Sequence, residues 1–243
     1  MRFALVNDEK ADPRPKLHGQ CPHCGEEVVS KCGRVNVWHW AHKSKEVCDP
    51  WWENETDWHR AWKGKFPEEW QEISAVDPDT GETHIADVKT SHDLVVEFQH
   101  SPMPLEELAA RERFYGNMIW IVDGQRGELD RSYFFLGLAS ATIQPDPLAY
   151  AFTWHGKSRI MHNWSDARSR VFIDFGDDVT KGSPVVWRLV LFDKKQKRGV
   201  VSPYPKHLLV QAILRGEEIG VPYLPTPEED SKTLERANES NGK

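Results

Sequence analysis

Residues 84–101 read H-I-A-D-V-K-T-S-H-D-L-V-V-E-F-Q-H-S, and this stretch decides the fold. Within it, the run 94–99 is rich in β-branched and aromatic residues and therefore predicts a buried strand. Side chains alternate between the two faces of a strand. The strand then carries Leu94, Val96 and Phe98 on one face and Val95, Glu97 and Gln99 on the other. A carboxylate and an amide on a buried strand cost stability unless something pairs with them.

A second short strand is predicted at residues 85–88, with a turn at 90–93 between the two. A hairpin of these strands brings Asp87 close to Glu97. Neighbouring carboxylates repel each other, and a hard divalent cation such as Mg²⁺, which prefers oxygen ligands, is the usual reason to keep both. The hairpin therefore predicts a metal site; the alternative is an edge hairpin whose Asp87 and Glu97 are solvated.

The order D, about ten residues, then E-x-Q resembles the active-site signature of the PD-(D/E)XK nuclease superfamily, with Gln99 where lysine is usual. The longer run A-D-V…V-V-E-F-Q-H-S-P is similar to the competence protein CoiA family. The resemblance implies a nuclease in which Asp87 and Glu97 hold Mg²⁺ or Mn²⁺. A glutamine amide donates only a neutral hydrogen bond, roughly half as strong as a charged one. E-x-Q is nevertheless the pattern of the CoiA family, and we expect Lys63 to supply the charge of the missing lysine.

The composition is that of a folded protein without a membrane span. The 243 residues are 39% hydrophobic and 28% charged, with a net charge of -7. No apolar run approaches the roughly 18 residues of a membrane helix, and the first residues are too polar for a signal peptide. We expect a cytoplasmic protein that does not bind membranes, and the negative charge confines any nucleic-acid contact to local basic groups.

A metal-binding module is predicted at residues 1–50, which contain all four cysteines. The spacing C-x2-C followed by H-x2-H points to zinc held by Cys21, Cys24, His39 and His42, with Cys48 or Cys32 as substitutes. A small β-hairpin module with buried, reduced cysteines is the alternative. The order C-P-x-C…G…H-x-A-H also resembles the N-terminal segment of CoiA-like proteins.

Residues 51–70 predict a helix, capped by Asn54 or Ser44, whose apolar stripe packs on the sheet. Glu55, His59 and Lys63 follow one another at four-residue spacing and form a polar ridge. The motif N-E-T-x-x-H-x-x-x-K resembles a helix of the CoiA family. The resemblance implies that Glu55 completes the metal site and that His59 and Lys63 contact the phosphate or steer the attacking water. A salt-bridged solvent face is the alternative.

The remaining core elements are a strand at 70–75, a helix at 105–116 and an apolar central strand at 118–122. The family pattern on the helix and before it is matched by Ser101, Arg111 and Tyr115, which we expect to contact nucleic acid. For Arg111, an ion pair with Glu107 is an equal alternative to a phosphate contact.

A β-rich extension is predicted at 126–224, with strands near 133–135, 150–154, 171–175 and 185–192 and a helix at 205–216. A basic hairpin tip, formed by Lys194, Lys195, Lys197 and Arg198, can follow a phosphate backbone or be a solvated turn. Residues 225–243 are polar and acidic and predict a disordered tail.

Together these patterns predict an α/β (α+β) protein with a PD-(D/E)XK, restriction-endonuclease-like core at 51–125 between the zinc module and the β-rich extension. The expected function is metal-dependent hydrolysis of phosphodiester bonds in single-stranded, duplex or branched DNA, in DNA uptake, recombination or phage-related processing, with protein partners in that pathway. Two alternatives stay open: a catalytically inactive DNA-binding accessory protein, and a zinc-stabilised adaptor that binds protein partners.

Overall fold

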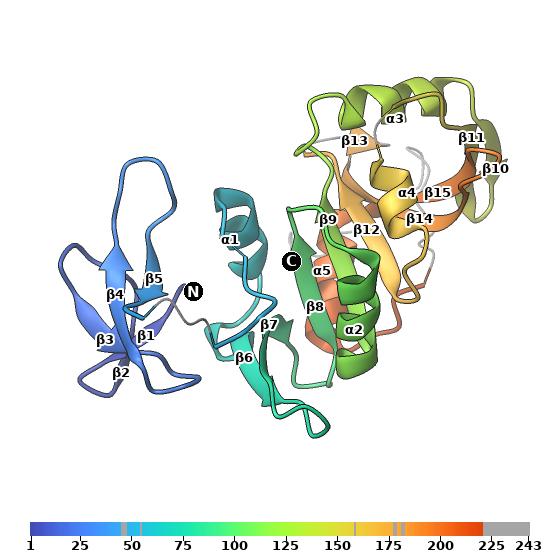
Figure 1. Ribbon diagram of the computed structural model, residues 1–243. Helices are drawn as coiled ribbons and strands as arrows, with labels where there is room; N and C mark the ends of the chain where they lie inside the picture. Colours follow the sequence, from blue (N-terminus) through green and yellow to red (C-terminus); the bar gives the residue numbers. More distant parts are fainter. Residues whose placement is uncertain (45–47, 54, 158, 177–178, 181–182, 221–243) are drawn as a thin grey trace, which may run out of the picture. The chain divides into compact units, whose positions relative to one another are not determined.

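The computed structural model describes residues 1–44, 48–53, 55–157, 159–176, 179–180 and 183–220, which form a mixed α+β fold (Figure 1). The chain divides into two compact units, Met1–Ile121 and Val122–Lys243. All the cysteines, histidines and acids proposed above as metal ligands belong to the first unit, and the basic hairpin tip belongs to the second.

The first unit begins with a small antiparallel sheet of order β2-β1-β3-β4-β5. Its strands are β1 (Ala4–Val6), β2 (Glu9–Ala11), β3 (His18–Gln20), β4 (Glu27–Lys31) and β5 (His39–His42). Met1, Ala4, Cys21, Val28 and Trp40 form its core. Glycine is required at position 19, because a Cβ there would lie 2.7 Å from the carbonyl oxygen of Leu5. So small a core suits a module that a metal ion stabilises.

The rest of the first unit follows the predicted order of elements. They are α1 (Asp57–Lys63), a 3-10 turn (Glu68–Trp70), β6 (Gln71–Val76), β7 (Thr83–Lys89), β8 (Val95–Gln99), α2 (Leu105–Tyr115) and β9 (Met118–Asp123). Strands β6, β7 and β8 form an antiparallel meander, and β9 pairs with β8. All residues of β8 and β9 are buried, as their apolar sequences predict. Gly116 ends α2 with a φ of 66°, a conformation that favours glycine.

Helix α1 is shorter than the predicted helix 51–70. It begins after Thr56, whose hydroxyl accepts from the His59 N–H, while His59 Nδ1 accepts from the Thr56 N–H at 3.2 Å. This reciprocal capping box satisfies two N–H groups of the first turn and fixes the start of the helix. The predicted caps are therefore wrong for Ser44, and Asn54 lies outside the described residues.

The second unit contains an antiparallel sheet of order β10-β11-β15-β14-β12. Its strands are β10 (Thr142–Pro145), β11 (Leu148–Thr153), β12 (Arg170–Asp174), β14 (Ser183–Asp193) and β15 (Arg198–Pro205), with β13 (Val179–Thr180) beside β14. Its helices are α3 (Asp130–Ala139), α4 (Ile160–Trp164) and α5 (Lys206–Arg215). Among all the residues described, no helix is both long enough and apolar enough to cross a membrane.

The aromatic run 133–135, predicted as a strand, is part of α3. Phe134 is fully buried, stacks on Phe175 and meets Trp187 edge-on. Aromatic packing against the sheet therefore outweighs the strand preference of these residues. The predicted helix 205–216 is α5, ended by Gly216 at a φ of 67°. The predicted tail 225–243 lies outside the described residues.

Candidate functional site

The predicted hairpin brings Asp87 of β7 and Glu97 of β8 together. The Asp87 N–H donates to Glu97 Oε1 at 3.1 Å, and the Phe98 N–H donates to Asp87 Oδ2 at 2.9 Å. The pairing of Val88 with Val96 sets this register, which places the two carboxylates side by side. Two carboxylates on adjacent strands form an acidic pair at this edge of the hairpin.

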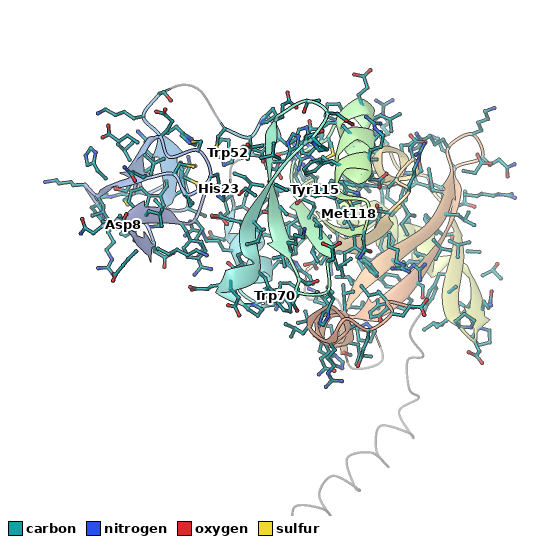
Figure 2. The ribbon with its side chains drawn as sticks, turned by 90° about the horizontal axis from the view of Figure 1, so that it is seen from below. Asp8, His23, Trp52, Trp70, Tyr115 and Met118 are labelled. Carbon is teal, nitrogen blue, oxygen red and sulfur yellow. The ribbon has the colours of Figure 1, made fainter. Side chains whose placement is uncertain are left out.

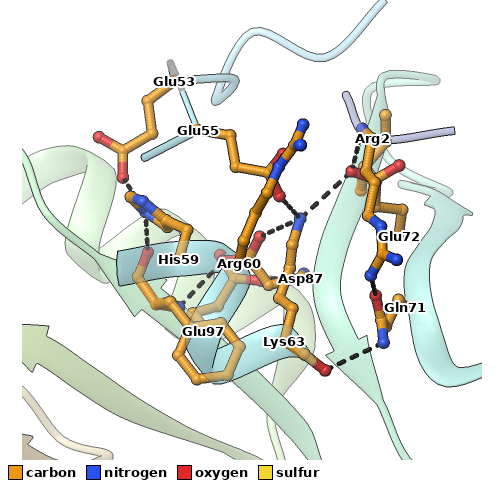
Figure 3. Close-up of polar contacts among 12 residues, drawn as sticks. Arg2, Glu53, Glu55, His59, Arg60, Lys63, Gln71, Glu72, Asp87 and Glu97 are labelled. Carbon is orange, nitrogen blue, oxygen red and sulfur yellow. Dashed lines mark hydrogen bonds and ion pairs between the residues drawn. The ribbon is translucent and has the colours of Figure 1, made fainter. Parts of the chain in front are cut away.

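Lys63, from the last turn of α1, is the cation at the centre of the acids (Figure 3). Its ammonium lies 2.9 Å from Glu55, 3.2 Å from Glu72 and 3.4 Å from Asp87. The Lys63 side chain is only 4% exposed. Burial opposes its charge, but the three carboxylates raise the pKa of Lys63 above its ordinary value. A buried, charged lysine thus balances the acids.

Glu72 is a member of this cluster that the sequence did not single out. The β6–β7 register leaves it opposite Asp87, and its φ of 54° lies in the left-handed region, which is costly for a residue with a side chain. Its carboxylate accepts from the N–H groups of Arg2 and Phe3. Burial opposes its ionisation, but Lys63 and these N–H groups lower the pKa of Glu72 to about 2. The strained backbone holds this carboxylate against Lys63.

Glu55 precedes α1, so the predicted ridge of Glu55, His59 and Lys63 is not a single helix face. Its carboxylate binds Lys63 and accepts from Arg60 Nε at 2.9 Å. Burial raises the pKa of Glu55, but Lys63 more than reverses that effect and lowers it. Within the described residues, no three acids of this site lie close enough to one another to share an ion as they stand. A metal held by Glu55 as well as by Asp87 and Glu97 would require Lys63 to move.

Arg111 of α2 is buried and faces Glu97. Its Nη1 donates to Glu97 Oε2 at 3.0 Å, and its Nη2 donates to the Trp51 carbonyl at 2.6 Å. It also forms the predicted alternative ion pair with Glu107, with Nε donating at 3.0 Å. The burial of Glu97 and the neighbouring Asp87 raise the pKa of Glu97, Arg111 opposes them, and the result is a pKa of about 8. Arg111 thus orients the Glu97 carboxylate.

His59 has partners at both ring nitrogens and connects α1 to β8. Nε2 lies 2.9 Å from the Phe98 carbonyl and 3.3 Å from Glu53 Oε1, while Nδ1 accepts the Thr56 N–H. Burial lowers the pKa of His59, but Glu53 and Asp87 raise it above its ordinary value. With these contacts His59 positions the end of β8 and does not point a free nitrogen at a substrate.

Glu53 is a second residue that the sequence did not single out. One of its oxygens lies on His59, and the other accepts from Gln99 Nε2 at 3.3 Å. The Gln99 amide also donates to the carbonyl of Ser101. Glu53 lies before α1 in a segment that is neither helix nor strand, where no periodic pattern marks it. It contacts both His59 and Gln99, two polar side chains that the resemblance singles out.

These groups line one cleft with an empty volume of about 570 Å³ that is open to solvent. Its acids and cations are Asp49, Glu53, Glu55, His59, Lys63, Glu72, Asp87, Glu97 and Arg111.

Tyr115 packs edge-on against Trp51 and Phe114. The proposed nucleic-acid contacts Ser101 and Tyr115 do not line this cleft.

A separate thiol–imidazole cluster lies beside the N-terminal sheet. One ligand atom from each of Cys21, Cys24, His42 and Cys48 lies within 4.8 Å of the others. Cys21 Sγ is 3.8 Å from Cys48 Sγ, and Cys24 Sγ is 3.3 Å from His42 Nε2. Three thiols and one imidazole match the donor set of a structural zinc site, so these residues can hold a metal such as zinc.

The predicted ligand His39 is not part of this cluster, and Cys48 takes its place. His39 and His42 both lie on β5, three residues apart, and side chains at that spacing point to opposite faces of a strand. The His39 ring instead hydrogen-bonds the Val37 carbonyl. Cys32, the other predicted substitute, also lies outside the cluster.

Cys48→Ser is expected to abolish stoichiometric zinc binding, whereas Cys32→Ser keeps it. The loss should exceed the roughly 10–100-fold that removal of an outer hydrogen-bond partner costs, because a ligand itself is removed. Zinc content per chain after dialysis of the purified full-length variants measures this. Equal zinc in both variants, or its loss from Cys32→Ser, contradicts the assignment.

The basic hairpin tip is a turn between β14 and β15, as predicted, with Asp193 paired to Arg198. Lys194, Lys195, Lys197 and Arg198 are all exposed. Lys194 pairs with Asp166, and Asp193 Oδ1 accepts from the N–H groups of Lys195 and Gln196. Their contact with nucleic acid stays a prediction.

Comparison with known proteins bears on the N-terminal segment. The family model described as competence protein CoiA, N-terminal domain, matches residues 14–50, which contain the four residues of the thiol–imidazole cluster. No curated protein and no solved structure matches the chain. Asp87 and Glu97 lie outside the matched segment. Residues 14–50 of this chain are thus similar to the N-terminal domain of the competence protein CoiA family.

Proposed function

We propose that this protein is a metal-dependent nuclease whose ligands are Asp87 and Glu97. The observation that carries the proposal is the pairing of these two carboxylates on adjacent strands, in a cleft that also contains a buried lysine 3.4 Å from Asp87. The match of residues 14–50 to the N-terminal domain of competence protein CoiA supports a role in DNA processing.

Four residues of the cleft, Asp87, Glu97, Lys63 and Arg111, have a part in this proposal. Asp87 and Glu97 would hold Mg²⁺ or Mn²⁺, which would polarise the phosphodiester and lower the pKa of a bound water. Hydrolysis adds the water oxygen to phosphorus and breaks the bond to one ester oxygen, which leaves with a proton. Lys63 supplies the positive charge that stabilises the phosphate oxygens, since the neutral amide of Gln99 cannot. Arg111 orients Glu97.

The second candidate is a non-catalytic DNA-binding protein that retains the nuclease-like hairpin. It is favoured by the two cations that neutralise the acids, since Lys63 contacts Asp87 and Arg111 contacts Glu97. In that case the acid cluster is a buried ion network, and divalent cations bind weakly or not at all.

Cleavage assays with labelled single-stranded, duplex and junction DNA distinguish the two candidates. Wild type is compared with Asp87→Ala and Glu97→Ala in Mg²⁺, in Mn²⁺ and without either ion. If the protein is a nuclease, cleavage should depend on the ion and fall roughly a thousandfold or more in both variants, because a bound metal lowers the activation barrier by several kcal/mol. DNA binding without cleavage supports the second candidate, and variants that cut as well as wild type overturn the proposed site.

A further inference from the structure

A second pocket, with mainly apolar walls, adjoins the catalytic cleft. Its empty volume is about 550 Å³. Trp40, Trp52 and Ile85 are among its walls, with Ser44 and Asp49 as polar groups. His42 and Cys48 of the thiol–imidazole cluster also line it. Met1, Asp49, Trp52 and Ile85 line both the pocket and the cleft. A molecule bound at the acids can therefore extend into this pocket.

Trp52 stands at the junction and is marked in Figure 2. It is 41% exposed, although the backbone that carries it is fixed. The Trp52 N–H donates to the Asp49 carbonyl at 3.2 Å, and the Trp51 N–H donates to Asp49 Oδ1 at 2.9 Å. Trp51 in turn stacks on His84 with ring centroids 3.3 Å apart. The indole of Trp52 is thus an anchored aromatic surface left open to solvent.

The chemistry of this pocket suits a nucleobase. A base is flat and uncharged, so it stacks on an indole and is not repelled by the neighbouring Asp49. The hydroxyl of Ser44 offers a hydrogen bond to its edge. A phosphate would meet no lysine or arginine among the residues that line this pocket. The pocket and the cleft therefore divide the substrate, with the base in one and the phosphate in the other.

We propose that this pocket binds one nucleobase of a single strand beside the phosphate that is cut, with Trp52 as its stacking platform. The proposal rests on the proposed nuclease function and adds a substrate class to it. Bases within a duplex are already stacked and paired, and removing one from the helix costs a few kcal/mol. Single strands and frayed ends present an unstacked base without that cost.

An abasic scan tests the proposal in the full-length protein. Binding of fluorescein-labelled single strands, each with one abasic nucleotide at a successive position, is measured in buffer without Mg²⁺ or Mn²⁺. One position is expected to weaken wild-type binding roughly five- to hundredfold, the effect of one stacked base. Trp52→Ala should weaken binding of the intact strand by a similar factor. In this variant the abasic nucleotide at that position should cause no further loss of affinity.

Trp38→Ala is the matched control, because Trp38 is 44% exposed and lines neither pocket. It should bind like wild type at every position. The proposal is overturned if no abasic position weakens binding more than the others, or if the free-energy losses from the abasic nucleotide and from Trp52→Ala are additive. It is also overturned if Trp52→Ala weakens the binding of a duplex by the same factor. Ion-dependent cleavage without a Trp52 effect refutes the pocket alone, and Trp52-dependent binding without cleavage refutes the nuclease function alone.

Discussion

Lys63→Met is expected to lower the free energy of unfolding by roughly 3–5 kcal/mol. The Lys63 ammonium is the shared partner of Glu55, Glu72 and Asp87, and its side chain is 4% exposed. Methionine fills a similar volume but leaves these carboxylates without their cation. Removing one partner of a buried ion network costs about this much, because uncompensated charge stays buried.

The pH dependence of this effect has a definite sign. In wild type, the lowered pKa of Glu72 gives stability that is present above its ordinary value of 4.5 and is lost as pH falls toward about 2. In Lys63→Met the same carboxylate lacks its cation, so its pKa rises and its protonated form is favoured on folding. The difference in stability between the two proteins should therefore shrink as pH falls below about 5.

Denaturant unfolding of both proteins at several pH values measures the effect, with Lys65→Met as the control. Lys65 is exposed, so its substitution should change stability by no more than about 0.5 kcal/mol. Adding Glu72→Gln to Lys63→Met should recover part of the loss by removing one unpaired charge. A Lys63→Met cost no larger than that of the control refutes the buried network.

Glu97→Gln is expected to stabilise the fold while it removes the DNA cleavage that we propose for this site. The folded-state pKa of Glu97 is raised to about 8 from an ordinary value of 4.5. Folding of this acid therefore takes up a proton between pH 4.5 and about 8, and the free energy of unfolding falls as pH rises through this range. Glutamine is permanently neutral, so the variant should be more stable than wild type at pH 7.5, by less than the full pKa shift because the ion pair with Arg111 is lost as well.

The comparison with Glu106→Gln isolates this effect, since Glu106 is an exposed acid in the first turn of α2. It should change stability by less than about 1 kcal/mol. Unfolding curves at pH 5 and 7.5 should show the Glu97→Gln gain only at the higher pH. A loss of stability at pH 7.5 would mean that Glu97 contributes as an ionised partner of Arg111.

The sequence predicts the central strands and α2 to within a residue or two because their signals are local. β9 is an uninterrupted apolar run, and a turn cluster separates β7 from β8. The proximity of Asp87 and Glu97 follows from that hairpin alone. Their counter-ions are harder to predict, since Lys63 and Arg111 come from helices α1 and α2 and their contacts depend on tertiary packing.

The errors have physical causes that spacing cannot show. Trp51 continues the apolar periodicity of the predicted helix, but its ring stacks on His84, and the Thr56 capping box starts α1 later. His39 has a spacing suited to zinc, but a strand turns it away from His42. In each case the residue type was informative, and the backbone conformation decided its partner.

The most direct test of a metal centre at these carboxylates is a crystal soaked in MnCl₂ and measured for anomalous scattering from manganese. We expect a peak within about 2.0–2.3 Å of oxygens from Asp87 and Glu97. We also expect the Lys63 ammonium to be displaced from its 3.4 Å contact with Asp87. The absence of a peak at saturating Mn²⁺, with Lys63 still in contact with Asp87, would contradict the proposed metal site.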